Sequence, residues 1–139
     1  MEKVKNSHDI TLQTLTTLSE ALELLQEKNI PHNYYLSFCD SVIQRFEYSI
    51  DNFWKFIKIY TIEILKITID ANSPKTVLRD AYDANIITKK EFEILIKATT
   101  RRNETSHAYN KNLAHAILEE IPLYYETMIT IIEKLKNNI

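Results

Sequence analysis

Residues 38–67 read FCDSVIQRFEYSIDNFWKFIKIYTIEILKI, and apolar side chains recur along this stretch at steps of three and four residues. The stripe consists of Phe38, Val42, Phe46, Ile50, Phe53, Ile57, Tyr60, Ile64 and Ile67. This spacing outweighs the β-branched residues near its C-terminal end, which taken singly favour a strand. The stretch therefore predicts an amphipathic helix about 45 Å long, at 1.5 Å per residue, as the centre of the fold.

Helical periodicity also precedes this stretch. The leucines within residues 12–25 step by threes and fours, which predicts a first helix. Ser7 or Asp9 is available as its N-cap, and Asn29 and Pro31 are typical of a helix that has ended. These two helices lie next to each other in the sequence and are expected to pack in an antiparallel pair.

A clear break follows the central helix. Ser73 is suited to an N-cap and Pro74 to a first helical position, so a short helix is expected from there to about Ala84. Thr88 and Glu91 have the spacing of a capping box, which places the start of a third main helix at Thr88.

The last helix is predicted from apolar residues at steps of three and four between Leu113 and Leu135. Pro122 lies inside it and lacks an amide proton, so a kink or a restart is expected there. Residues 1–139 are therefore predicted to form a single all-α domain, an antiparallel four-helix up-and-down bundle with an extra short helix.

Composition excludes several classes of protein. The chain has no glycine, which excludes phosphate-binding loops, dinucleotide fingerprints and nucleophile elbows in their usual forms. With 17 basic and 19 acidic residues, it has no overall field that would attract a polyanion. Its single cysteine, Cys39, lies in an apolar segment, and residues 1–10 do not resemble a secretory signal. We therefore expect a cytoplasmic protein with a buried thiol and no contact with a membrane.

The third main helix changes character towards its end. Its inward stripe continues from apolar to polar residues in the order Phe92, Leu95, Thr99, Arg102, Ser106 and Tyr109. Because an unpaired guanidinium is costly to bury, this end is expected to open onto solvent, a partner or a polyanion. Arg102 and His107 would lie about 140° apart on a continuous helix, so both reach one phosphate only if the helix breaks near Thr105. Asn110 is available to cap the helix that follows.

Residues 102–109, RNETSHAY, resemble the R-X4-H-X-Y motif of HEPN-domain proteins, in particular the nucleotidyltransferase substrate-binding branch that includes HepT-type toxins. Two further stretches resemble the same branch in the same order. They are residues 45–48 with 54–55, and residues 73–74 with 77–81. The chain lacks the glycine that relatives often have near Asn85, which affects a loop outside the motif.

The resemblance implies a HEPN-like homodimer whose paired motifs face a cleft, acting as a metal-independent endoribonuclease with no cofactor. In that role Arg102 would stabilise charge on the scissile phosphate and His107 would exchange protons with the 2′-hydroxyl and the leaving oxygen. Asn103 and Arg101 would support phosphate binding. The cognate MNT-type nucleotidyltransferase, the antitoxin of the pair, would neutralise this toxin by transferring AMP to Tyr109. Nothing in the sequence specifies the RNA target.

Three other kinds of site fit the sequence less well. A di-iron bundle needs two Glu-x-x-His motifs, and only Glu104 with His107 has that spacing. One cysteine and four scattered histidines do not predict a zinc site, and the residues after His107 differ from those of histidine phosphotransfer proteins. The remaining alternative is a non-catalytic subunit that binds nucleotide or substrate for a small nucleotidyltransferase. It would use the same cationic site.

Overall fold

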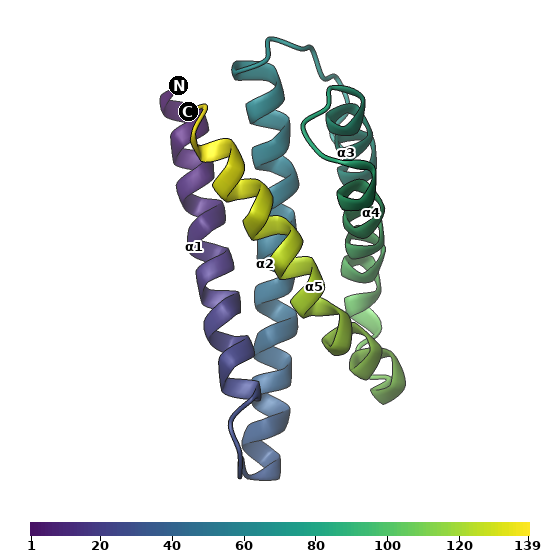
Figure 1. The fold of residues 1–139 in the computed structure, drawn as a ribbon. Coiled ribbons are helices and arrows are strands. Elements are labelled where there is room, and N and C mark those ends of the chain that lie inside the picture. Colours follow the sequence, from purple (N-terminus) through teal and green to yellow (C-terminus); the bar gives the residue numbers. More distant parts are fainter.

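The computed structural model describes all residues, 1–139, and contains five α-helices, one short 3-10 helix and no strand. The elements are α1 (Glu2–Leu25), α2 (His32–Glu63), α3 (Pro74–Asp83), α4 (Lys89–Glu104), η1 (Thr105–His107) and α5 (Lys111–Lys136). Four long helices run alternately up and down, α3 lies beside α4, and the two chain ends meet at one end of the bundle (Figure 1). The predicted all-α bundle with an extra short helix is confirmed.

Helix α2 forms the centre of the core, as its apolar stripe predicts. Phe46, Phe53 and Ile57 are fully buried there, in contact with side chains from the other long helices. The helix differs from the prediction at its ends, since it begins at His32 and ends at Glu63. The chain then turns at Lys66, whose φ is 58°, so the last residues of the predicted stripe lie outside the helix.

Helix α1 begins earlier than predicted. It starts at Glu2, with Met1 at the N-cap position, and neither Ser7 nor Asp9 caps it. The reason is that Val4 and His8 extend the buried face by two further turns. His8 is buried, and its Nε2 donates to the carbonyl oxygen of Ile132 on α5 at 3.0 Å. This hydrogen bond ties the first helix to the last.

The predicted starts of α3 and α4 are confirmed. Ser73 is the N-cap residue of α3, and Pro74 is the first residue of the helix. The Thr88 hydroxyl accepts from the backbone N–H of Glu91 at 3.1 Å, and the Glu91 carboxylate accepts from the N–H of Thr88 at 2.9 Å. Asn85, in the loop between them, has φ of 62°, which asparagine tolerates better than most residues. Asn85 therefore adopts the positive-φ conformation for which glycine is the usual residue.

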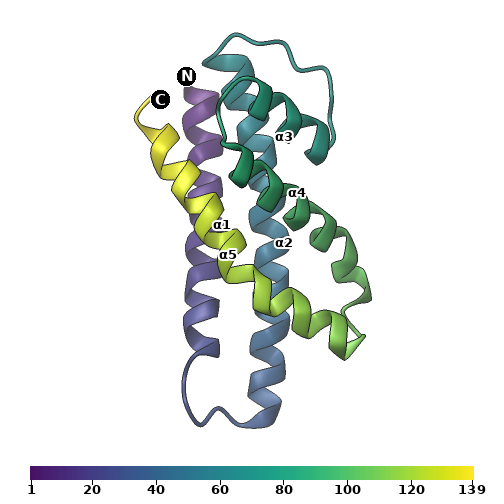
Figure 2. The same cartoon turned by 45° about the vertical axis from the view of Figure 1, so that its right-hand side comes forward.

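Helix α5 is continuous through Pro122, so of the two predicted alternatives the restart does not occur. The proline is exposed, and it has no N–H to donate to the helix. The helix crosses in front of α2 and returns to the N-terminal end of α1, as Figures 1 and 2 show. None of the helices provides an apolar stretch of the length that a bilayer requires. Cys39 is buried, as predicted.

Candidate functional site

The R-X4-H-X-Y stretch forms a corner between two helices. Helix α4 ends at Glu104, the single turn η1 follows, and α5 begins at Lys111. The Asn110 side chain caps α5 by accepting from the N–H groups of Asn112 at 3.0 Å and Leu113 at 3.2 Å. The predicted break near Thr105 and the predicted cap at Asn110 are both confirmed. The corner holds the motif at one end of the bundle (Figure 2).

Arg102 is bound by two carboxylates of helix α2. Its Nε donates to Asp51 Oδ1 at 3.2 Å and its Nη2 to Asp51 Oδ2 at 3.1 Å, while its Nη1 donates to Glu47 Oε2 at 2.8 Å. The hydrogen bonds to Asp51, and then the charges of Asp51 and Glu47, raise the pKa of Arg102, against the opposing effect of burial. The guanidinium is therefore held against α2 as a permanent cation.

Glu47 has a second contact, which fixes the turn after Arg102. The Thr105 hydroxyl is 2.8 Å from Glu47 Oε2 and 2.7 Å from the carbonyl oxygen of Arg102. Glu47 belongs to the stretch of residues 45–48 that resembles the family, but neither Glu47 nor Asp51 is among the predicted site residues. Their spacing of four residues on one helical face is the only local signal that they act together.

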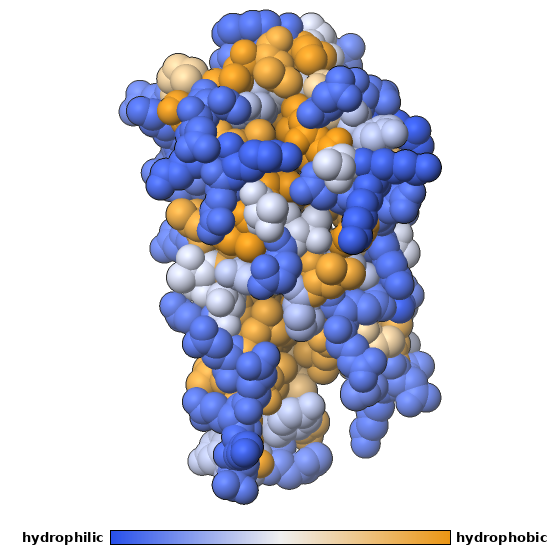
Figure 3. Space-filling view, viewed as in Figure 1, coloured by the Kyte–Doolittle hydropathy of each residue, from blue (hydrophilic) through white to orange (hydrophobic).

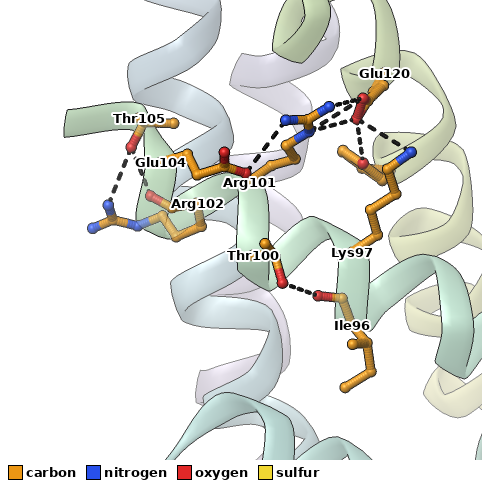
Figure 4. A network of polar contacts seen from close by, with 9 residues as sticks. Ile96, Lys97, Thr100, Arg101, Arg102, Glu104, Thr105 and Glu120 are labelled. Carbon is orange, nitrogen blue, oxygen red and sulfur yellow. Dashed lines mark hydrogen bonds and ion pairs between the residues drawn. The ribbon is translucent and has the colours of Figure 1, made fainter. Parts of the chain in front are cut away.

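Arg101 points to the opposite side and binds helix α5 (Figure 4). Its Nε and Nη2 donate to the two carboxylate oxygens of Glu120 at 2.8 and 2.9 Å, and its Nη1 donates to Glu104 at 3.3 Å. The Tyr124 hydroxyl donates to Glu120 at 2.8 Å, and burial followed by this bond raises the pKa of Tyr124. Arg101 thus joins α4 to α5 in the structure.

The Arg101 pair predicts how stability changes with pH. The hydrogen bond from Arg101, and then that from Tyr124, lowers the pKa of Glu120 in the folded chain. The ionised Glu120 carboxylate therefore stabilises the folded chain at pH values above the ordinary pKa of glutamate. This stabilisation is lost as the pH falls through the lowered pKa of Glu120. The free energy of unfolding of the wild type should exceed that of Glu120→Gln at about pH 6, and the difference should shrink towards about pH 3.

Urea unfolding followed by circular dichroism measures this difference. Glu119→Gln is the matched control, because Glu119 is exposed and pairs only with His115 on the same helix. A difference between wild type and Glu120→Gln that does not change with pH would contradict the assignment of this stabilisation to the Glu120 carboxylate.

His107 and Tyr109 are the exposed members of the corner. The imidazole is exposed, Tyr109 is 83% exposed, and their ring centroids are 6.0 Å apart with the planes at 74°. Asn103 is exposed on the last turn of α4. No hydrogen bond joins Arg102 to His107, since Arg102 binds α2 and His107 faces solvent. The structure thus brings the motif to one corner without joining Arg102 to His107.

An open groove of about 540 Å³ adjoins the corner, between the N-terminal half of α2 and η1. Its lining is Ser37, Asp40, Ser41, Ile43, Gln44, Glu47, Thr105 and Ala108. Hydroxyl and carboxylate groups dominate this surface, and the molecule is notched at that end (Figure 3). No three His, Cys, Asp or Glu side chains lie close enough to share a metal ion. The groove reaches Glu47 and Thr105, which contact Arg102.

Comparison with known proteins assigns the family. The family described as nucleotidyltransferase substrate binding protein like matches residues 12–137, which is nearly the whole chain. The chain belongs to this family. A crystal structure of a Thermus thermophilus protein is similar with a TM-score of 0.77 and 30% identity, covering 90% of this chain and 98% of that one. The resemblance inferred from the three sequence stretches is confirmed.

A more distant structure shares the fold. A crystal structure of a mutant MntA-HpeT toxin–antitoxin matches with a TM-score of 0.67 and 16% identity, covering 93% of this chain and 98% of that one. No curated protein sequence is significantly similar to the chain. Membership of the nucleotidyltransferase substrate binding protein like family therefore rests on the family match and the Thermus structure.

Proposed function

We propose that the chain is the toxin of a toxin–antitoxin pair, a metal-independent endoribonuclease that a partner nucleotidyltransferase neutralises. The observation that carries this proposal is the corner itself, where a helix break presents Arg102, His107 and Tyr109 at one end of a bundle of this family. The match to a structure described as a toxin–antitoxin supports the two-component role. The family description supports a nucleotidyltransferase as the partner.

The proposed reaction is attack of the RNA 2′-hydroxyl on the adjacent phosphorus. The new bond joins the 2′-oxygen to phosphorus, the bond to the 5′-oxygen breaks, and the products carry a 2′,3′-cyclic phosphate and a 5′-hydroxyl. His107 takes the proton of the 2′-hydroxyl or supplies the one that the leaving 5′-oxygen needs. Arg102 stabilises the extra negative charge of the phosphorane through its planar donors. Asn103 orients the phosphate from the adjoining turn.

A homodimer completes this site in the proposal. One copy offers a single imidazole at the corner, whereas the reaction needs both a base and an acid. A second copy facing the same cleft supplies the other. Arg101 supports the site from behind, because its bonds to Glu120 hold α4 against α5 just before the corner.

The activity is tested with the purified chain, single-stranded RNA and a chelator, in the absence of the partner. Cleavage with 2′,3′-cyclic ends is expected for the wild type, and growth arrest is expected when the chain is expressed alone. Arg102→Ala should lose both, whereas Arg79→Ala should lose neither, because Arg79 lies on α3 against Phe92. A folded wild type that neither cleaves RNA nor arrests growth would end the enzyme proposal.

Tyr109 is the proposed site of neutralisation, because it is the most exposed aromatic side chain of the corner. In the transfer of AMP, the Tyr109 oxygen bonds to the α-phosphorus of ATP, pyrophosphate leaves and the phenol proton is released. The attached AMP would place a phosphate and a nucleoside beside His107 and block the site by charge and bulk. Incubation with the partner nucleotidyltransferase and ATP should raise the intact mass by one AMP. Tyr109→Phe should abolish the increase, and Tyr48→Phe, at another exposed tyrosine, should retain it. An unchanged wild-type mass would contradict the modification.

The second candidate is a non-catalytic subunit that binds nucleotide or substrate for a nucleotidyltransferase. The family description, which names substrate binding, favours this candidate. Titration calorimetry with ATP, together with the RNA cleavage assay, separates the candidates. The non-catalytic subunit should bind ATP, Arg102→Ala should weaken that binding, and RNA should not be cleaved. A neighbouring reading frame for a short nucleotidyltransferase supports both and does not discriminate.

A further inference from the structure

The carboxylate of Asp51 occupies an edge of Arg102 that can bind a phosphate through two N–H groups. Arginine recognises phosphates and carboxylates alike through two parallel N–H groups. In the structure that fork is formed by Nε and Nη2, and both donate to Asp51, at 3.2 and 3.1 Å. An RNA phosphate that binds Arg102 in this way must therefore displace Asp51.

The adjacent arginine provides an internal comparison. Arg101 binds Glu120 through the same edge, but at 2.8 and 2.9 Å, and the two side chains are 21% and 22% exposed. The Arg102 and Asp51 side chains are 34% and 38% exposed. Longer hydrogen bonds and easier access of water make the Asp51 pair the weaker of the two. It is therefore the pair that an incoming anion can exchange.

The charges around Arg102 disfavour an anion while Asp51 stays in place. One guanidinium faces the carboxylates of Asp51 and Glu47, and Asp40 lines the adjoining groove. Local charge is therefore negative before any phosphate arrives. Unlike Asp51, Glu47 also accepts a hydrogen bond from the Thr105 hydroxyl. This bond stabilises the turn that leads to His107. Asp51 contacts only Arg102 at this site.

We propose that Asp51 is an autoinhibitory mask, a carboxylate that imitates the substrate phosphate and holds Arg102 in a closed state. This inference rests on the proposed function of Arg102 as the phosphate-binding group. Opening moves the guanidinium fork from Asp51 to the phosphodiester, and no covalent bond changes. Glu47 keeps its hydrogen bond to Thr105 during this exchange, so the corner remains in place. The wild-type chain should therefore bind and cleave RNA less well than a chain in which Asp51 does not pair with Arg102.

The test measures binding of a single-stranded 2′-O-methyl RNA, which lacks the reacting hydroxyl and is not cleaved. Fluorescence anisotropy should show that Asp51→Asn, which keeps the size of the side chain and removes its charge, lowers the dissociation constant by about fivefold, the scale of a partly exposed ion pair. Cleavage of ordinary RNA should become faster by a similar factor. The double variant with Arg102→Ala should show no gain, and Glu119→Gln, which removes the charge of an exposed carboxylate that pairs only with His115, should bind as the wild type does.

The outcomes separate the mask from the proposed function. Equal binding by the wild type and Arg102→Ala would refute the phosphate-binding role of Arg102, and the mask with it. Weaker binding by Arg102→Ala, with unchanged or weaker binding by Asp51→Asn, would overturn the mask alone and make Asp51 a positioning residue. Circular dichroism is recorded for each variant. Loss of the helical signal in Asp51→Asn would overturn the mask by showing that this carboxylate maintains the fold.

Discussion

Replacing His107 by alanine is expected to lower the rate of RNA cleavage by roughly 10²–10⁴-fold, the usual contribution of a positioned proton-transfer group. Because the imidazole is exposed and makes no hydrogen bond that holds helices together, the fold should be unchanged. Single-turnover cleavage of a defined RNA measures the effect, and growth arrest by the expressed chain should disappear in parallel.

His115→Ala is the matched control for this prediction. His115 is also exposed, lies on the first turns of α5 and pairs only with Glu119, at 3.0 Å. It should cleave RNA at the wild-type rate. If His107→Ala and His115→Ala retain equal activity, proton transfer by His107 is excluded, even if Arg102 proves to bind phosphate.

Replacing Phe46 by alanine is expected to reduce the free energy of unfolding by about 3–5 kcal/mol. Phe46 lies in the middle of α2, is fully buried and stacks on Tyr124 of α5 with ring centroids 5.7 Å apart. Its removal takes away packing from both helices and leaves a cavity between them. Urea unfolding at neutral pH gives the difference.

The control for this change is Tyr48→Ala, two residues along the same helix. Tyr48 faces solvent, so its loss should alter the free energy of unfolding by no more than about 0.5 kcal/mol. A small effect at Phe46, or equal effects at both positions, would contradict α2 as the centre of the core.

Local sequence signals predicted most of the fold. The three-and-four spacing located α2, and Thr88 with Glu91 located the start of α4, because both features act within a few residues of one another. The start of α1 was misplaced for the opposite reason. His8 extends that helix through a hydrogen bond to Ile132, which is 124 residues away in the chain, and no local pattern signals such a contact.

The candidate site could be predicted in outline but not in its electrostatics. The inward stripe that turns polar at Arg102 led to the prediction of an open end, and the guanidinium is indeed only partly buried there. The carboxylates that bind it are 51 and 55 residues away in the sequence. Charged residues are common on helix surfaces, so their pairing with Arg102 became visible only when α2 and α4 were placed together.

The central claim is that Arg102 and His107 bind one phosphodiester together. Nuclear magnetic resonance of the labelled chain tests it directly, by following the Arg102 Nε–H and the His107 ring C–H signals during titration with a 2′-O-methyl dinucleotide. Both signals should shift with one dissociation constant, and the shift of each should vanish when the other residue is replaced by alanine. Saturation that moves only one of them, or moves them with different constants, would show that the two groups do not share a phosphate.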